Sequence, residues 1–247
     1  MTVTTRRIRV AAHGRGAMPA LLAEPGRGSG PGILLLHEIF GITDYIHRRA
    51  TALAEAGYVT LVPDLYWRLG DDVVIDEGGE GALEVGLDYR QRLDFGAAVD
   101  DAVAALEYLD EMEESLGRGG VLGFCLGAGI AFGVAVHADP VTAVFYYGSD
   151  IPGQLARAHE VRSPALFHWG GDDDYVPAEA RAAVDSAFSG RTDVETHVYP
   201  GASHAFDNDV SPLFSRPEQA AEAWQRTEDF LARTLPVGNI HWQPRVD

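Results

Sequence analysis

The sequence has 247 residues, 46% hydrophobic and 23% charged, a composition typical of a soluble globular protein. One α/β domain of this length can bury a large core, so we predict a single domain over residues 1–247, with 237–247 left as a tail of unassigned structure. The formal net charge of −18 disfavours nucleic acid and membrane surfaces as partners, because both carry negative charge.

The residue types exclude several kinds of chemistry. All 19 basic residues are Arg, so mechanisms that require Lys, such as Schiff-base, pyridoxal and P-loop chemistry, are excluded. The single Cys cannot form an intrachain disulfide, and no Cys and His have the spacing of a zinc site. The first ten residues lack the apolar stretch of a signal peptide, and no apolar run reaches the roughly 18 residues of a membrane span. We therefore expect a cytoplasmic protein.

In the first part of the chain, short apolar strands alternate with helical patterns. Two strands are predicted at 6–12 and 18–24, joined by a Gly-rich turn at 13–16. The run at 32–37 is uniformly apolar, as expected for a strand buried on both faces, and it is followed by a helix at 44–56 and a strand at 58–63. This alternation predicts an α/β fold with a mostly parallel central sheet flanked by helices on both faces.

The rest of the chain continues the alternation after one interruption. Residues 64–88 are acidic and Gly-rich without a clear period, which suggests an excursion above the sheet. A helix with one apolar stripe is predicted from Phe95 to Leu109. A later helix has Pro177 in its first turn, and Ser215 and Glu218 suggest a capping box before the last helix. The other predicted elements are strands at 120–124, 141–147, 165–169 and 194–199 and a helix at 128–136.

Residues 123–127 read Gly-Phe-Cys-Leu-Gly, a G-x-C-x-G variant of the nucleophile elbow. An elbow is a sharp turn from strand to helix in which flanking glycines let neighbouring backbone approach a strained nucleophile. Here an apolar strand precedes the motif and a helical stretch follows it. Cys125 is therefore the candidate nucleophile, although most free cysteines are small buried hydrophobic residues.

An elbow nucleophile requires an acid and then a histidine later in the chain, each on a loop after a strand. Residues 172–174 are three aspartates after the strand at 165–169, and His204 follows the strand at 194–199. The histidine would take or hold the thiol proton, and the acid would fix its tautomer and stabilise its charged form. The order Cys, Asp, His is satisfied.

Other interpretations of these residues remain open at this stage. The three aspartates could form a solvated loop or a site for a hard cation, although they lack the glycine spacing of a calcium loop. Ser149 or Ser203 could be the nucleophile of a serine esterase, but neither lies in an elbow. A non-catalytic binding or redox-sensing protein could also use this fold, since fold does not fix function.

Six motifs together resemble the dienelactone hydrolase family. They are His-Glu-Ile-Phe-Gly at 37–41, Pro-Asp-Leu-Tyr at 63–66, Gly-Phe-Cys-Leu-Gly at 123–127, Tyr-Tyr-Gly at 146–148, Pro-Ala-Leu-Phe-His at 164–168 and Ser-His-Ala-Phe at 203–206. The resemblance covers most of the chain. It implies an α/β-hydrolase fold and hydrolysis of a small lactone or ester, with no metal or organic cofactor.

The resemblance also implies a role for several residues. It aligns Cys125 with the family nucleophile, His204 with its histidine, and Asp173, by its spacing before Val176-Pro177, with its acid. Glu38 corresponds to the glutamate that interacts with the resting cysteine and helps to control formation of the thiolate. The oxyanion-hole donors are expected to be the backbone N–H groups of Ile39 and Leu126.

The substrate-binding side chains depart from the family pattern. Members that act on dienelactone carry one arginine after the Asp-Leu-Tyr motif and another shortly after the histidine. Leu83 stands at the first position, with Arg90 and Arg92 as the nearest candidates, and no arginine lies in the few residues after His204. Tyr146 and Tyr147 are further candidates for the pocket wall, although such pairs often serve packing. We expect a neutral small-molecule substrate; the oligomeric state is not determined by the sequence.

Overall fold

The computed structural model describes residues 2–12, 16–211 and 213–238. The predicted turn at 13–16, except Gly16, and the predicted tail, except its first two residues, therefore lie outside the described residues. The strands are β1 (Thr4–Ala11), β2 (Ala17–Glu24), β3 (Gly32–Leu36), β4 (Val59–Pro63), β5 (Gly120–Phe124), β6 (Ala143–Tyr146), β7 (Ala165–Gly170) and β8 (Val194–Tyr199). The helices are α1 (Asp44–Glu55), α2 (Ala82–Arg92), α3 (Phe95–Glu111), α4 (Leu126–Ala138), α5 (Ala178–Ala187) and α6 (Pro217–Thr234), with a 3₁₀ segment η1 (Pro152–Glu160).

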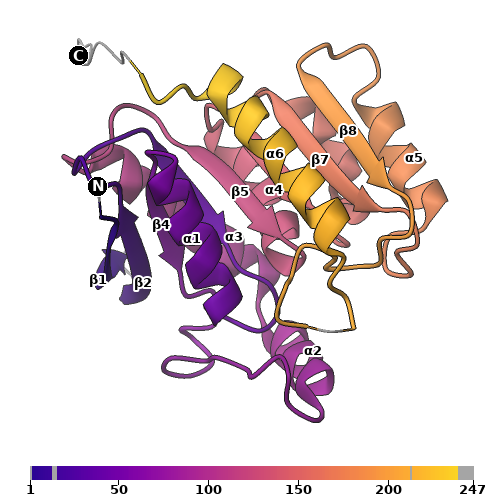
Figure 1. Cartoon of the computed structure of the whole chain (residues 1–247), viewed down its shortest axis with the longest axis horizontal. Coiled ribbons are helices and arrows are strands. Elements are labelled where there is room, and N and C mark those ends of the chain that lie inside the picture. Colours follow the sequence, from indigo (N-terminus) through magenta and orange to yellow (C-terminus); the bar gives the residue numbers. More distant parts are fainter. Residues whose placement is uncertain (1, 13–15, 212, 239–247) are drawn as a thin grey trace.

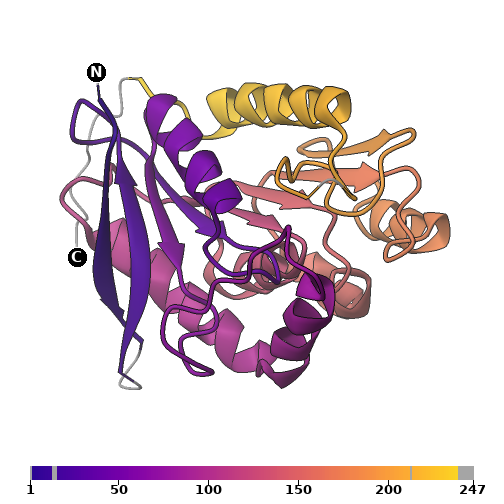
Figure 2. The same cartoon turned by 60° about the horizontal axis from the view of Figure 1, so that its bottom comes forward.

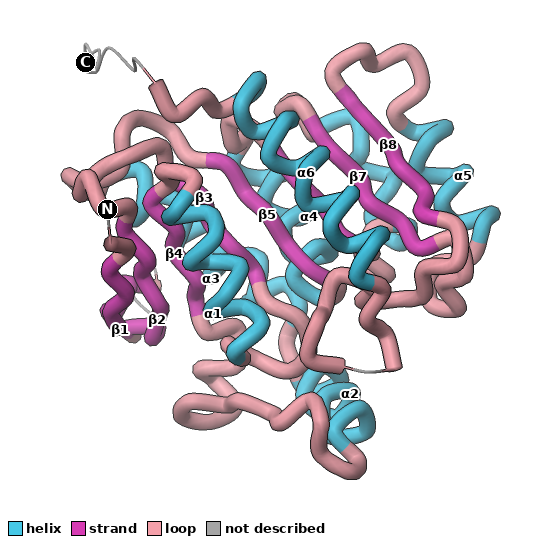
Figure 3. The backbone as a smooth tube through the Cα atoms, in the orientation of Figure 1, coloured by secondary structure: helices cyan, strands magenta, loops and turns pink. Residues whose placement is uncertain are grey.

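The described strands form one sheet in the order β1-β2-β4-β3-β5-β6-β7-β8 (Figures 1 and 3). The first two strands pair antiparallel with each other, and β2 pairs antiparallel with β4. The six strands from β4 to β8 run parallel. Every residue of β3, β4, β5, β6 and β7 is buried, as the uniformly apolar runs in the sequence predict for strands covered on both faces.

Helices cover both faces of the sheet, which confirms the predicted architecture. In Figure 2, α1 and α6 lie on one side of the strands and α3, α4 and α5 on the other. Helix α4 is apolar on all sides and is buried along its first ten residues, between the sheet and α3. Helix α3 has the predicted apolar stripe, and the side chain of Asp94 caps its first turn. In the described part of the chain, no helix combines the length and apolar character needed to cross a membrane.

Three details of the sequence prediction are corrected by the structure. The acidic excursion contains a helix, α2, which the sequence pattern did not reveal because only Ala82 and Gly86 in it are buried. The capping box is wrong: α6 begins at Pro217, so Ser215 lies one residue before the N-cap, Arg216, which makes no side-chain capping bond. Pro177 is the N-cap of α5 and not part of its first turn.

The excursion closes over the carboxyl ends of the parallel strands. Its backbone returns to the chain after β3, where the N–H of Ile75 donates to the carbonyl of Phe40 at 2.9 Å. Helix α2 lies beyond the ends of the strands in Figures 1 and 2, on the same side as the loop between β8 and α6. The edge at which ligands bind in open parallel sheets is thus partly enclosed.

Candidate active site

A pocket of about 320 Å³ opens at the carboxyl ends of the parallel strands. Its walls come from the loops after β3, β5, β6, β7 and β8, together with one face of α2. Most of the lining surface is apolar, and several polar side chains contribute to it. The lining residues are Glu38, Ile39, Phe40, Leu83, Leu87, Arg90, Cys125, Ser149, Tyr175, His204, Ala205 and Phe214.

Cys125 lies at a strained turn between β5 and α4. Its φ is +51° and its ψ −114°, a conformation that a residue with a side chain rarely adopts. The turn needs glycine on both sides: a Cβ on Gly123 would lie 2.3 Å from the carbonyl oxygen of Gly127, and a Cβ on Gly127 would lie 2.2 Å from that of Leu36. The flanking glycines predicted from the motif therefore allow the backbone to pass close on both sides.

Cys125, His204 and Asp173 form a continuous row. The Sγ of Cys125 lies 3.1 Å from Nε2 of His204, and Nδ1 of His204 lies 2.9 Å from Oδ2 of Asp173. The other carboxylate oxygen of Asp173 accepts the N–H groups of Tyr175 at 2.8 Å and Val176 at 3.1 Å. Asp173 is buried, whereas its neighbours on both sides are exposed, so the structure distinguishes one of the three aspartates.

The histidine sits in a charged and nearly enclosed position. Burial lowers the pKa of His204, but the charge of Cys125 and the bonds to Asp173 and Cys125 outweigh it and raise the pKa to about 10. The rings of Tyr147 and Tyr175 contact the imidazole, with centroids at 5.3 and 4.8 Å. Hydrogen bonds thus hold both nitrogens of the imidazole and two tyrosine rings pack against it, and with its raised pKa it keeps its proton at neutral pH.

The two predicted oxyanion donors come from the segment after β3 and from the start of α4. Leu126 is the first residue of α4, where a backbone N–H has no acceptor within the helix. Ile39 lines the pocket, and its own carbonyl accepts the hydroxyl of Tyr66 at 3.0 Å. Because Gly127 packs against the end of β3, the two segments are held close together.

Glu38 is buried beside the nucleophile and is held by an asparagine. Nδ2 of Asn208 donates to Oε2 of Glu38 at 2.7 Å and also donates to Glu77. Burial, followed by the charge of Glu77, raises the pKa of Glu38 to about 8, against the lowering effect of Asn208, Tyr147 and His204. Sequence reasoning missed Asn208 and Glu77, because their roles depend on loops that are far apart in the chain.

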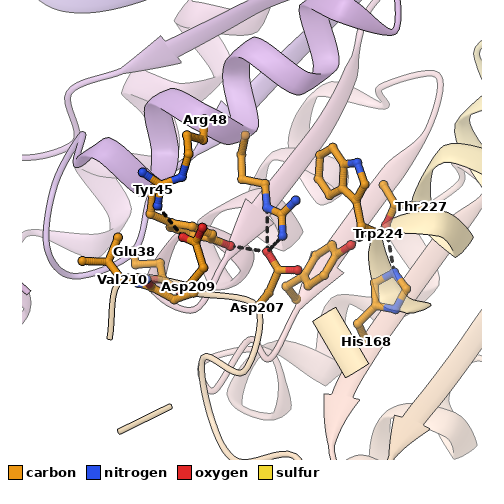
Figure 4. Close-up of polar contacts among 12 residues, drawn as sticks. Glu38, Tyr45, Arg48, His168, Asp207, Asp209, Val210, Trp224 and Thr227 are labelled. Atoms are coloured by element: carbon orange, nitrogen blue, oxygen red, sulfur yellow. Dashed lines mark hydrogen bonds and ion pairs between the residues drawn. The ribbon is translucent and has the colours of Figure 1, made fainter. Parts of the chain in front are cut away.

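Asp207 belongs to the stretch after His204 that lacks the family's arginine, and it lies outside the pocket lining. Asp207 is buried and accepts the hydroxyl of Tyr45 at 2.5 Å (Figure 4) and the guanidinium of Arg49 at 2.6 and 2.8 Å. The guanidinium of Arg49 in turn stacks on Trp224, 4.3 Å from the ring centroid. This cluster ties the loop that carries His204 to α1 and α6.

Only some of the residues predicted to bind substrate line the pocket. Leu83 and Arg90 line the pocket, but Arg90 is paired with Asp150. Arg92 is outside the pocket and pairs with Asp88 one turn away on the same helix. The two tyrosines at 146 and 147 are fully buried and are not part of the lining.

Packing explains why neither tyrosine reaches the pocket. The hydroxyl of Tyr146 lies 2.6 Å from that of Thr227, a buried residue of α6. The ring of Tyr147 packs against the imidazole of His204, with the two ring centroids 5.3 Å apart. Tyr146 therefore serves packing, the alternative that an aromatic pair at a strand end allows, and Tyr147 contacts the site only through the histidine.

Similarity to known proteins extends over nearly the whole chain. The sequence profile of the Dienelactone hydrolase family matches residues 18–235. A carboxymethylenebutenolidase of Pseudomonas sp. (strain P51) is 36% identical over 96% of this chain and 98% of its own length. Another from Rhodococcus opacus is 32% identical, with 92% and 91% covered. The crystal structure of a putative dienelactone hydrolase from Klebsiella pneumoniae matches the fold with a TM-score of 0.78 at 24% identity, covering 94% of this chain and 100% of that one.

The fold is therefore that of an α/β hydrolase, and the chain belongs to the dienelactone hydrolase family. It is a carboxylic ester hydrolase, the class that includes enzymes acting on lactones. This membership argues against a purely non-catalytic or redox-sensing protein. The serine alternative has no geometric support at Ser203, whose hydroxyl donates to backbone carbonyls. Among the described residues, no group of three or more His, Cys, Asp or Glu side chains is placed to hold a metal ion.

The raised pKa of Glu38 predicts a pH dependence of stability. Between pH 4.5 and about 8 the unfolded chain has lost the Glu38 proton while the folded chain retains it, so stability falls as pH rises through this window. Titration of one group changes the free energy of unfolding by at most about 1.4 kcal/mol per pH unit. Glu38→Gln removes this contribution, so the variant should gain stability relative to the natural chain from pH 5 to pH 8, as measured by urea unfolding.

Glu80, an exposed residue of the same excursion, supplies the control. The difference in free energy of unfolding between Glu80→Gln and the natural chain should not change with pH in the same way. A difference between Glu38→Gln and the natural chain that stays constant from pH 5 to pH 8 would show that Glu38 titrates normally in the folded state.

Proposed function

We propose that this enzyme hydrolyses small neutral lactones or esters by acyl transfer to Cys125. The observation that carries the proposal is the row of contacts from Sγ of Cys125 to His204 at 3.1 Å and from His204 to Asp173 at 2.9 Å. A nucleophile, a proton carrier and an orienting acid in hydrogen-bond reach of one another are the requirements of covalent acyl transfer. Cys125 and His204 line the pocket, and Asp173 is buried behind the histidine.

In the first half of the reaction, the thiolate of Cys125 attacks the carbonyl carbon and a C–S bond forms. The carbonyl electron pair moves to oxygen, and the N–H groups of Ile39 and Leu126 stabilise the resulting oxyanion. When the tetrahedral intermediate collapses, the C–O bond to the leaving group breaks. His204, which holds its proton at rest, gives that proton to the leaving alkoxide.

In the second half, His204 takes a proton from water, and the hydroxide attacks the thioester carbonyl. Collapse of this intermediate breaks the C–S bond, releases the carboxylic acid and restores Cys125. Asp173 keeps the imidazole in one orientation throughout, with Nε2 toward the sulfur. Glu38, buried in the wall of the same pocket, adjusts the charge around the resting cysteine. All described strands belong to one sheet, which supports residues 1–247 acting as a single domain.

The nucleophile is tested by removing it and by blocking it. Cys125→Ala should abolish hydrolysis while leaving the unfolding midpoint close to that of the natural chain, because the change removes one atom and adds no bulk. Cys125 is the single cysteine of the sequence, so one equivalent of iodoacetamide should inactivate the natural enzyme in parallel with labelling. Ser203→Ala is the control for the serine alternative and should remain active. Full hydrolysis by the alkylated enzyme would contradict the cysteine mechanism.

The acid is tested with three matched substitutions on one loop. Asp173→Asn should reduce kcat strongly, by a factor on the order of 10⁴ if the triad behaves like that of serine enzymes, because the imidazole loses its orienting partner. Asp172→Asn and Asp174→Asn should have small effects, since both side chains are exposed and neither contacts His204 in the described structure. Similar mild losses at all three positions would show that this loop carries no triad acid.

The charge of the pocket supports a neutral substrate. The position where a carboxylate-binding arginine is expected holds Leu83, which joins Leu87 in an apolar wall. Besides the protonated imidazole of His204, Arg90 is the one cation among the lining residues of this pocket, and its guanidinium is paired with Asp150. A substrate carboxylate would have to compete with Asp150 for this arginine and would face the net charge of −18.

The expected selectivity follows from the energy of one such contact. A hydrogen bond to a charged group is worth about 1.5 to 3 kcal/mol, and 1.4 kcal/mol is a factor of ten. Neutral lactones should therefore have kcat/KM at least about tenfold higher than carboxylate-bearing analogues of the same size. Asp150→Asn should reduce the ratio of kcat/KM between neutral and carboxylate-bearing lactones, because it frees Arg90. Arg92→Ala should leave this ratio unchanged. A preference of the natural enzyme for the carboxylate substrate that Arg90→Ala abolishes would contradict the proposal.

A further inference from the structure

His37 is a buried histidine next to the site, and both of its ring nitrogens are used. Nε2 lies 3.0 Å from the backbone nitrogen of Leu65, and Nδ1 lies 2.6 Å from the carbonyl oxygen of Glu38. A backbone N–H can only donate, so Nε2 must be the unprotonated acceptor. A carbonyl can only accept, so Nδ1 must carry the proton. The two partners therefore fix a single neutral tautomer.

The neutral state is also the one that burial favours. Burial lowers the pKa of His37 to about 4, against the opposing effect of the hydrogen bond to Glu38. At the pH of ordinary assays the ring is thus an uncharged bridge between two backbone segments. The chemistry proposed above makes no use of it as an acid or a base.

The carbonyl that His37 binds belongs to the peptide unit of Glu38 and Ile39. The described chain contains no cis peptide bond, so the C=O of Glu38 and the N–H of Ile39 point in opposite directions across one rigid plane. Fixing the oxygen at 2.6 Å from Nδ1 therefore also fixes the direction of the N–H. The hydroxyl of Tyr66 holds the next carbonyl, that of Ile39, at 3.0 Å and limits rotation of the following peptide.

We infer that His37 is a positioning residue for the oxyanion hole, which holds the Glu38–Ile39 peptide so that the N–H of Ile39 is directed at the developing oxyanion. The inference rests on the proposed function, because it assigns a task within that mechanism. A hydrogen bond accepted by the carbonyl of an amide also polarises the amide and strengthens its N–H as a donor. His37 thus affects both the direction and the strength of this donor.

The packing of the elbow supplies the second half of the same hole. A Cβ on Gly127 would lie 2.6 Å from the carbonyl oxygen of His37 itself, so the first turn of α4 rests directly on the residue that orients the peptide. The donor at Leu126 and the donor at Ile39 are therefore positioned through one contact region. Removal of an oxyanion donor typically costs a factor of about 10² to 10³ in kcat, which sets the size of the expected effect.

Two substitutions separate the two bonds of His37. Asn places its amide nitrogen near the position of Nδ1 and can still donate to the carbonyl of Glu38, but it cannot reach Leu65. Gln places its amide oxygen near the position of Nε2 and can still accept from Leu65, but it loses the donor to Glu38. Each variant leaves one buried backbone group without its partner, so both should be destabilised to a similar degree in urea unfolding.

Catalysis should separate the two variants. His37→Gln should lower kcat by roughly 100-fold with little change in KM, whereas His37→Asn should rescue kcat to within about fivefold of the natural enzyme. A trifluoromethyl ketone, which binds the cysteine as a charged tetrahedral adduct, should lose affinity for His37→Gln in parallel with kcat/KM. Alkylation of Cys125 by iodoacetamide builds no oxyanion, so its rate should be the same in all three proteins.

The assignment is overturned by equal losses of kcat in the two variants, or by loss of alkylation rate in step with kcat, since either would indicate a general structural role. If His37→Gln fails to fold, His37→Asn decides alone, and a kcat below a tenth of the natural value would overturn the assignment. Alkylated natural enzyme that keeps full turnover would instead contradict the cysteine mechanism itself.

Discussion

The contact between the first turn of α4 and the end of β3 is the constraint on which the site depends. At Gly127 the backbones approach so closely that a single Cβ would meet three backbone atoms of residues 36 and 37 within 2.6 Å. This approach accompanies the positive φ of Cys125 and brings the segment after β3 close to the first turn of α4. The nucleophile and both predicted oxyanion donors are thus fixed by backbone geometry, and the remaining groups are added by loops.

The loops around the site bury several carboxyl groups, and each of these has a hydrogen-bond partner. Each buried carboxylate near the nucleophile has a defined donor: Asp173 is bonded to His204, Glu38 to Asn208, and Asp207 to Arg49. A buried carboxyl group without a partner is costly, so these pairings allow an acidic chain to bury several acids, and the pKa of about 8 keeps Glu38 uncharged at neutral pH. The same pairings leave the part of the pocket beyond the thiol to apolar side chains, which is consistent with an uncharged substrate.

The sequence predicted the features that depend on local signals. Uniform apolar runs identified the parallel strands, and the glycines around Cys125 identified the elbow because they are required by its backbone. Other features depend on residues that are distant in the chain and could not be predicted. The state of Arg90 depends on Asp150, sixty residues later, and α2 is held by tertiary contacts that leave only two of its own residues buried. Glu38 and the oxyanion donors came from family resemblance and not from the pattern alone.

The position of α2 separates the side chains that shape the pocket from the groups proposed to react. The helix supplies Leu83, Leu87 and Arg90 to the wall of the pocket, while the cysteine, the histidine and the aspartate come from loops attached directly to the sheet. Mutations in this one short segment can therefore alter which molecules are admitted without disturbing the reacting groups. The shape and charge of the pocket can therefore be changed through α2 with the backbone geometry of the elbow left as it is.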